Sequence, residues 1–144
     1  MLTEKDYCDY DTCVALKELG YDQPSIAFYP CQDIIVDCVD SNGELYEAEY
    51  YKGNLALYSS LNNKNHDINK VQAPLLYEAQ KWLRENHNLH VEVGYNPVLC
   101  WYVYRVWEHQ DEIAEGEAFP SYEEALSTAI YMAVEYLKGK SNGN

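Results

Sequence analysis

Basic residues are scarce in this sequence, whereas acidic residues are abundant. The 144 residues include 10 Lys and Arg against 24 Asp and Glu, which gives a net charge of −14. The acids are spread along the chain, with 13 in residues 1–72 and 11 in residues 73–144. A field of this sign repels phosphate backbones, so direct nucleic-acid binding is disfavoured, whereas a basic protein partner would be attracted. The simpler interpretation is that the charge keeps the protein soluble.

Disulfide pairing, a signal peptide and a membrane span are not indicated. The five cysteines include no CxxC motif, and their odd number leaves one unpaired in any disulfide scheme. No apolar run approaches the length of a membrane span. We therefore expect a cytoplasmic protein without membrane contact. Cys38 and Cys100 lie within apolar runs and are predicted to be small core residues.

Catalytic motifs are also missing. The sequence has no glycine-rich phosphate loop, no HExxH and no GxSxG, so no catalytic residue, cofactor or metal site is predicted. His87 and His90 form an HxxH, but Asn88 and the start of a strand fall between them, so the two side chains should diverge. Acid pairs such as Glu47 and Glu49 are interpreted as solvated faces. We expect a non-enzymatic protein, and a small hydrolase is the alternative.

Two helices are predicted before residue 90. The first covers residues 11–19, and Gly20 follows it as the residue that ends the helix. The second begins at Pro74, a residue that suits the first helical position. Its apolar residues form one continuous face, namely Leu75, Leu76, Ala79, Trp82 and Leu83.

The last helix has the clearest signals. Ser121 and Glu124 form a capping box after Pro120. Gly139 is predicted to end the helix, which leaves residues 139–144 as a flexible tail. The apolar face consists of Leu126, Ala129, Ile130, Ala133 and Leu137.

Several strands are predicted between the helices. The Asn42-Gly43 turn joins two of them in a hairpin. The last, residues 98–107, is apolar on both faces and is therefore expected to be central in its sheet. The polar residues 59–73 are predicted to form a long loop, and the acidic residues 108–118 a connector with room for one short strand. The six predicted strands are residues 25–29, 33–39, 44–51, 55–58, 89–95 and 98–107.

This order of elements predicts an α+β fold. An antiparallel β-sheet with about three helices packed mainly on one face buries the predicted apolar surfaces most economically. No internal repeat or linker divides the sequence, so residues 1–144 are expected to form a single domain.

Arg105 is the most informative residue, because it lies within an otherwise apolar strand. A buried guanidinium needs an anionic partner, which is either an internal Asp or Glu or a phosphate or carboxylate of a ligand. In the second case neighbouring rings would stack on a base or sugar, and Lys81, Arg84, Lys64 and Lys70 would add positive charge unless they are ordinary surface charges. The predicted ligand-binding residues are Arg105, Trp101, Tyr102, Tyr104, Trp107, Lys81 and Arg84.

Three segments resemble small proteins from Bacteroides-type bacteria, phages and prophages. They are TCVALKELGYDQP (12–24), APLLYEAQKWLRENHNLHVEV (73–93) and FPSYEEALSTAIYMAVEYLK (119–138). The likeness is best in AQKWLRE (79–85) and SYEEAL (121–126), and the resemblance covers roughly half of the chain but not residues 31–72. Because no active site is assigned in that group, no functional residue is carried over. The resemblance implies a mobile-element protein that works inside a bacterial cell. Small proteins in that setting counter host defence by sequestering a signal molecule or by blocking a defence protein.

Two functional hypotheses follow. The first is a phage-type binding protein that sequesters a small nucleotide-derived signal molecule without chemistry. The second is an acidic interaction protein that inhibits a host defence protein by docking on its basic surface. Assembly into a homo-oligomer is compatible with both.

Overall fold

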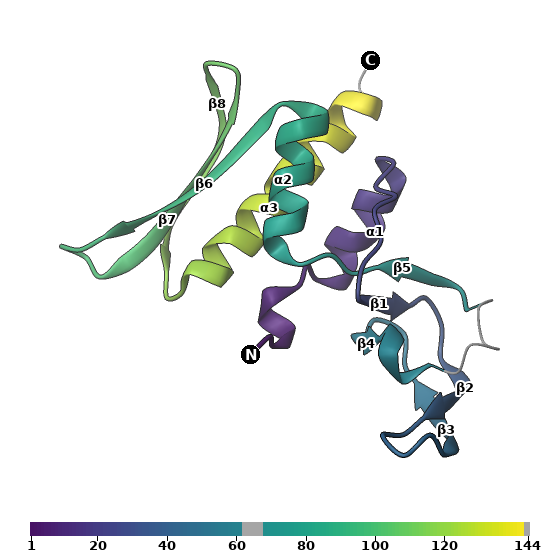
Figure 1. Cartoon of the computed structure of the whole chain (residues 1–144). Helices are drawn as coiled ribbons and strands as arrows, with labels where there is room; N and C mark the ends of the chain where they lie inside the picture. The colour runs from purple at the N-terminus through teal and green to yellow at the C-terminus, as the bar shows by residue number, and fades with distance from the viewer. Residues whose placement is uncertain (62–67, 143–144) are drawn as a thin grey trace.

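Helices and antiparallel strands alternate along the chain, as predicted for an α+β fold (Figure 1). The computed structural model describes residues 1–61 and 68–142. The three α-helices in this part of the chain are α1 (Tyr10–Glu18), α2 (Leu76–His87) and α3 (Tyr122–Asn142), and two short 3-10 helices cover Glu4–Asp6 and Tyr58–Ser60. None of the described helices is both long and apolar enough to cross a membrane.

The strands form three small antiparallel sheets instead of the one sheet predicted. Their orders are β4-β1-β5, β2-β3 and β6-β7-β8. The predicted Asn42-Gly43 hairpin is β2–β3, and the predicted central strand is β7, which lies between β6 and β8. The eight strands are β1 (Ala27–Pro30), β2 (Ile34–Val39), β3 (Leu45–Tyr50), β4 (Ala56–Leu57), β5 (Lys70–Gln72), β6 (Leu89–Asn96), β7 (Trp101–Glu108) and β8 (Asp111–Phe119).

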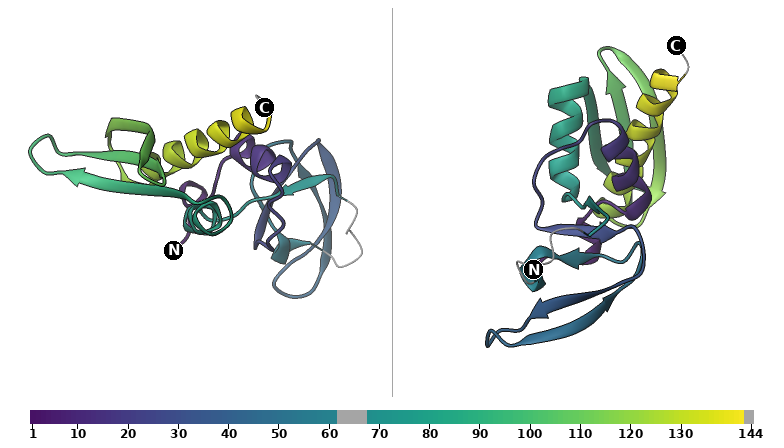
Figure 2. Two further views of the ribbon diagram at one scale, coloured as in Figure 1. Left: turned by 90° about the horizontal axis from the view of Figure 1, so that it is seen from above. Right: turned by 90° about the vertical axis from the view of Figure 1, so that its right-hand side faces the viewer.

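The main core lies between the helices and one face of the β6–β8 sheet. Helix α3 packs against all three strands, α2 packs against β6 and α3, and α1 packs against α3 and β5. The other face of this sheet carries no helix, and the β2–β3 hairpin lies at the opposite end of the molecule (Figures 1 and 2). Among the side chains fully buried in the core are Leu83, Leu89, Val106, Ala129 and Ile130.

Two predicted helix ends need correction. Helix α2 begins at Leu76 and not at Pro74, because the carboxylate of Glu78 accepts a hydrogen bond from the backbone nitrogen of Leu75 at 2.9 Å and so caps the helix there. Helix α3 does not end at Gly139 but continues to Asn142. Gly139 lacks the positive φ that a helix-terminating glycine adopts, whereas Gly20 after α1 has φ +98°. The predicted cap at Ser121 is confirmed, with Glu124 N donating to Ser121 Oγ and Ser121 Oγ donating to Glu124 Oε2, both at 3.2 Å.

The connecting segments also differ from the predictions. The acidic residues 108–118 contain most of the nine-residue strand β8, and residues 59–73 contain the end of a 3-10 helix and strand β5. Residues 97–100 form the β6–β7 turn, so β7 begins three residues later than predicted. Cys100 lies in this turn, exposed and with φ +56°, and is not the core residue predicted, whereas Cys38 is fully buried.

Candidate functional site

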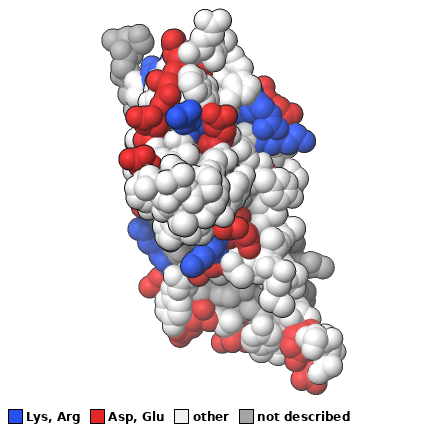
Figure 3. Space-filling view, turned by 90° about the vertical axis from the view of Figure 1, so that its left-hand side faces the viewer, with Lys and Arg blue, Asp and Glu red and all other residues white. Residues whose placement is uncertain are grey.

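Strand β7 places alternate side chains on the two faces of its sheet. Tyr104 and Val106 face the helices and are 4% and 0% exposed. Arg105 lies between them, points to the face without helices and is exposed. The prediction of a buried guanidinium at this position is therefore wrong, because no second layer covers this open face. Figure 3 views the molecule from the side on which the sheet lies in Figure 1, where uncharged surface separates groups of acidic and basic side chains.

The residues beside Arg105 on both neighbouring strands are glutamates. Glu92 of β6 and Glu115 of β8 are in register with it. A side-chain hydrogen bond with Glu115 raises the pKa of Glu112 above its usual value, although the charge of Arg105 acts in the opposite direction. Arg105 makes no ion pair with a described residue, although glutamates flank it on both neighbouring strands.

Two of the predicted aromatic residues share the open face with Arg105. Trp107 Nε1 donates a hydrogen bond to Glu92 Oε1 at 2.8 Å, which fixes the orientation of the indole. Trp101, at the start of β7, has a buried Nε1 without a hydrogen-bond partner in the described part of the chain. The open face therefore combines half-buried indole rings with carboxylates.

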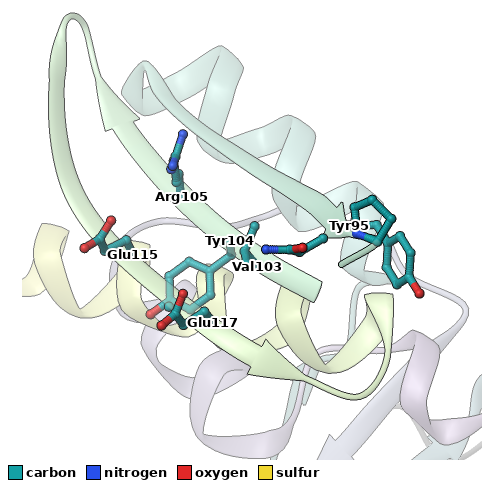
Figure 4. Close-up of a pocket in the computed structure, with 9 residues that line it drawn as sticks. Tyr95, Val103, Tyr104, Arg105, Glu115 and Glu117 are labelled. Carbon is teal, nitrogen blue, oxygen red and sulfur yellow. The ribbon is translucent and has the colours of Figure 1, made fainter. Parts of the chain in front are cut away.

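A hollow of about 570 Å³ opens beside Arg105 (Figure 4). A volume of this size lies within the range of small-molecule sites. Its charged lining residues are one guanidinium and two carboxylates, so an anionic ligand would meet repulsion from Glu115 and Glu117 as well as attraction to Arg105. The labelled residues of its lining are Tyr95, Val103, Tyr104, Arg105, Glu115 and Glu117.

The other two predicted rings serve packing on the helix side of β7. The Tyr102 ring lies 5.0 Å from the Tyr95 ring and 6.2 Å from the Tyr122 ring, measured between centroids. Tyr104 packs 5.6 Å from Phe119, and burial raises the pKa of its hydroxyl. Tyr104 nevertheless contributes to the lining of the hollow beside Arg105, whereas Tyr102 does not.

The predicted cations of helix α2 are not brought to Arg105. Lys81 lines a separate groove of about 380 Å³ and lies 4.0 Å from the carboxylate of Glu85. Arg84 is exposed and lines neither this groove nor the hollow beside Arg105. Of the two loop lysines, Lys70 lies in β5 beside a third hollow, and Lys64 is outside the described residues.

The two histidines of the HxxH motif do not meet. His87 packs against the Trp82 ring at 4.8 Å, and burial lowers its pKa. His90 Nε2 instead forms a hydrogen bond with Asn88 Oδ1 at 3.1 Å. The described part of the chain contains no cluster of three or more His, Cys, Asp or Glu arranged for a metal ion.

Sequence reasoning missed the glutamates that surround Arg105. Glu92 was visible as the polar member of an alternating strand, but nothing in the sequence gives the pairing register that sets it opposite Arg105. Glu112 and Glu115 were not placed beside Arg105, because residues 108–118 were interpreted as a connector with room for only one short strand. A cation placed among these carboxylates would favour their ionised forms. Comparison with known proteins found no matching family model, no similar curated protein and no similar solved structure.

Proposed function

We propose that this protein is a non-enzymatic interaction protein that docks the open face of its β6–β8 sheet on a basic surface of another protein. The observation that carries the proposal is the group of Glu92, Glu112 and Glu115 around a single arginine on an uncovered sheet face. Lysine or arginine side chains of a partner would form charge-assisted hydrogen bonds with these carboxylates. Trp101 and Trp107 would supply the apolar contact that anchors such interfaces.

The charge of the whole molecule supports the same function. A net charge of −14 attracts a basic partner over several ångströms and speeds association, while it keeps the protein from associating with itself. Arg105 would add specificity, because it repels a basic residue placed directly opposite it and so restricts the register of docking. With the resemblance to phage proteins, we expect the partner to be a defence protein of a bacterial host.

Charge reversal on the sheet tests this proposal. Immobilised wild-type protein should retain a specific basic protein from a bacterial extract, with retention that falls steeply as salt rises. The variant Glu112→Lys/Glu115→Lys should lose that protein, whereas Arg105→Gln should retain it at least as well. The control Glu4→Lys/Asp22→Lys changes the net charge equally at exposed positions away from the sheet, and it should behave as the wild type. Equal loss in both double variants would show that only overall charge matters, which contradicts a docking face.

Capture of a small anionic, nucleotide-derived ligand is the second candidate function, and the hollow beside Arg105 is the observation that favours it. In that case Arg105→Gln should abolish binding, the opposite of its expected effect on a basic partner. A panel of cyclic and ADP-ribose-type nucleotides should then raise the melting temperature of the wild type but not of Arg105→Gln. The absence of any shift with the wild type would leave only the docking function.

A further inference from the structure

The outer edge of strand β3 is a second place where a partner can bind. Strands β2 and β3 pair regularly from Ile34–Tyr50 to Val39–Leu45, without a register shift. An isolated bridge between Cys38 and Leu61 touches the free edge of β2. In contrast, no strand in residues 1–61 or 68–142 pairs with the outer edge of β3.

The backbone of this edge presents a row of hydrogen-bonding groups to solvent. Asp40 N donates to Glu44 O at 2.9 Å at the turn of the hairpin, and in an antiparallel pair bonded and non-bonded positions alternate from there. The amides of Leu45, Glu47 and Glu49 therefore point away from β2. No backbone hydrogen bond from these three amides to a described residue outside the hairpin is found. Such an edge is a template for an added strand.

The β2–β3 hairpin packs on the rest of the protein through one face, and in the described part of the chain it forms a sheet of only two strands. The Tyr50 ring packs 6.1 Å from the Phe28 ring, and its hydroxyl lies 3.5 Å from Cys38 Sγ. Two-stranded sheets are marginally stable, and a third strand strengthens them. The packing of this face therefore fixes the orientation of the outer edge of β3. The two-stranded sheet would become more stable when a third strand pairs with that edge.

A hollow of about 320 Å³ adjoins this edge on the anchored face. Tyr46, Tyr51 and Leu57 contribute to its lining and are 46%, 49% and 43% exposed, which is high for large apolar side chains. Alternate side chains of a strand added to β3 would lie beside Tyr46 and Tyr50, so they would enter this hollow. Apolar side chains suit these positions.

The charge of the hairpin selects the kind of partner. Residues 31–51 contain six Asp and Glu and no Lys or Arg. Glu47 lies on the face of β3 opposite to the hollow, beside the other set of side chains of an added strand, whereas Glu49 lines the hollow and its carboxylate accepts a hydrogen bond from the Tyr51 hydroxyl. A second copy of this protein would place its own glutamates there, and like charges in cross-strand positions are destabilising. Basic side chains would be stabilised at the same positions.

We propose that the outer edge of β3 binds an extended basic segment of a partner protein as a third strand of the β2–β3 sheet. Its apolar side chains alternate into the tyrosine-lined hollow, and its basic side chains lie beside Glu47 on the opposite face. This edge is separate from the open face of the β6–β8 sheet and lies at the other end of the molecule (Figure 1). The protein would thus hold partner chains at two distant surfaces, and either surface can be tested without the other.

Amide hydrogen exchange with a model peptide tests the proposal. A synthetic peptide of about six residues, the usual strand length, that alternates arginine and valine serves as the probe. At saturation it should slow exchange of the Leu45, Glu47 and Glu49 amides by about tenfold, because each becomes hydrogen-bonded. The same peptide N-methylated at every residue keeps its charge but cannot pair, so it should have no such effect. Equal slowing by the methylated peptide, or no slowing by either, would overturn the proposal.

A pair of variants at one position separates backbone pairing from charge. Glu47→Pro removes an outward amide at a position where an edge strand tolerates proline, so it should abolish the protection of Leu45 and Glu49. Glu47→Gln keeps the amide and loses one charge, so it should weaken binding only a few-fold. Unchanged resonances of Val36 and Cys38 would show that the hairpin is intact. Protection at the same amides in concentrated protein without peptide would identify a second copy as the occupant and contradict the proposal.

Discussion

At the scale of single residues, the packing of the β6–β8 sheet depends on a glycine, Gly116. Tyr104 of β7 is in register with Gly116 of β8. A Cβ atom on Gly116 would lie 2.8 Å from Tyr104 Cζ and closer still to Cε2. The ring is 4% exposed and packs against Phe119 at 5.6 Å, so a shift of the ring would disturb this packing. The Tyr104 ring therefore covers Gly116, and this packing requires a residue without a side chain at position 116.

We expect Gly116→Ala to lower the free energy of unfolding by about 1–3 kcal/mol, the usual cost of overpacking a buried site. Urea denaturation at neutral pH measures this change. In a Tyr104→Leu background the added methyl group meets a smaller side chain, so the penalty should shrink. An equal penalty in both backgrounds would show that the ring is not its cause.

The matched control for this substitution is Gly139→Ala. A Cβ on Gly139 would meet no atom within 4 Å, and the residue lies inside helix α3. Replacing a helical glycine with alanine reduces the entropy lost on folding, so this variant should be more stable by about 0.5–1 kcal/mol. The opposite signs of the two glycine substitutions would tie the effect of Gly116→Ala to its contact with Tyr104.

The environment of Arg105 shows what sequence reasoning lacks at this scale. Trp101, Val103 and Trp107 gave β7 an apolar outer face, which indicated burial on both sides. In the structure these side chains lie half-buried on an open face, since large side chains lie along the sheet and cover its backbone without a second layer. Periodicity reports which residues share a face, but not whether another element covers that face.

At the scale of elements, one carboxylate ties the end of β7 to the last turns of α3. Glu108 accepts a hydrogen bond from Tyr136 Oη at 2.6 Å and another from Lys140 Nζ at 3.0 Å. The two hydrogen bonds hold the pKa of Glu108 below its usual value, the bond from Tyr136 being the larger cause. Together these contacts fasten the part of α3 that extends past Gly139.

Because the pKa of Glu108 is depressed in the folded state, its contribution to stability should be present at neutral pH. It should disappear as pH falls below about 4, the range in which an unperturbed carboxylate binds its proton, and on through the lower folded-state pKa. The difference in unfolding free energy between the wild type and Glu108→Gln, measured by urea denaturation from neutral to acidic pH, should therefore shrink in that range. Glu135→Gln, in an exposed pair 3.9 Å from Lys138, is the control and should change stability little. A difference that grows on acidification would contradict this assignment.

The elements that sequence predicted best were those with local signals. The Ser121 capping box located the start of α3, and the Asn42-Gly43 turn located the β2–β3 hairpin, because in each case a few neighbouring residues determine the geometry. Strand β8 was expected only as one short strand within a connector, because an exposed edge strand rich in glutamate resembles an acidic linker in sequence. The division into three sheets and the pairing of Glu92 and Glu115 with Arg105 depend on contacts between distant segments, which no local pattern specifies.

At the scale of the whole molecule, two electrostatic effects of opposite sign compete. The net charge of −14 destabilises the compact state, because it brings 24 acidic groups closer together than in the unfolded chain. Four ion pairs in the described residues act against this, and each has at least one side chain that is more than one third exposed. Exposed pairs contribute only about 0–1 kcal/mol each, so the repulsion should dominate.

Added salt should therefore stabilise this protein, in contrast to one held together by surface ion pairs. Raising sodium chloride from about 0.01 M to about 0.15 M shortens the screening length from about 30 Å to about 8 Å, which weakens long-range repulsion more than contacts at 3–4 Å. We expect the melting temperature, followed by circular dichroism at pH 7, to rise over this range. A variant with several exposed glutamates outside the ion pairs changed to glutamine should begin at a higher melting temperature and respond less to salt, because less repulsion is left to screen. A fall in melting temperature with salt would mean that the ion pairs outweigh the repulsion. The acidic surface would then carry no excess of negative charge that is available to a basic partner.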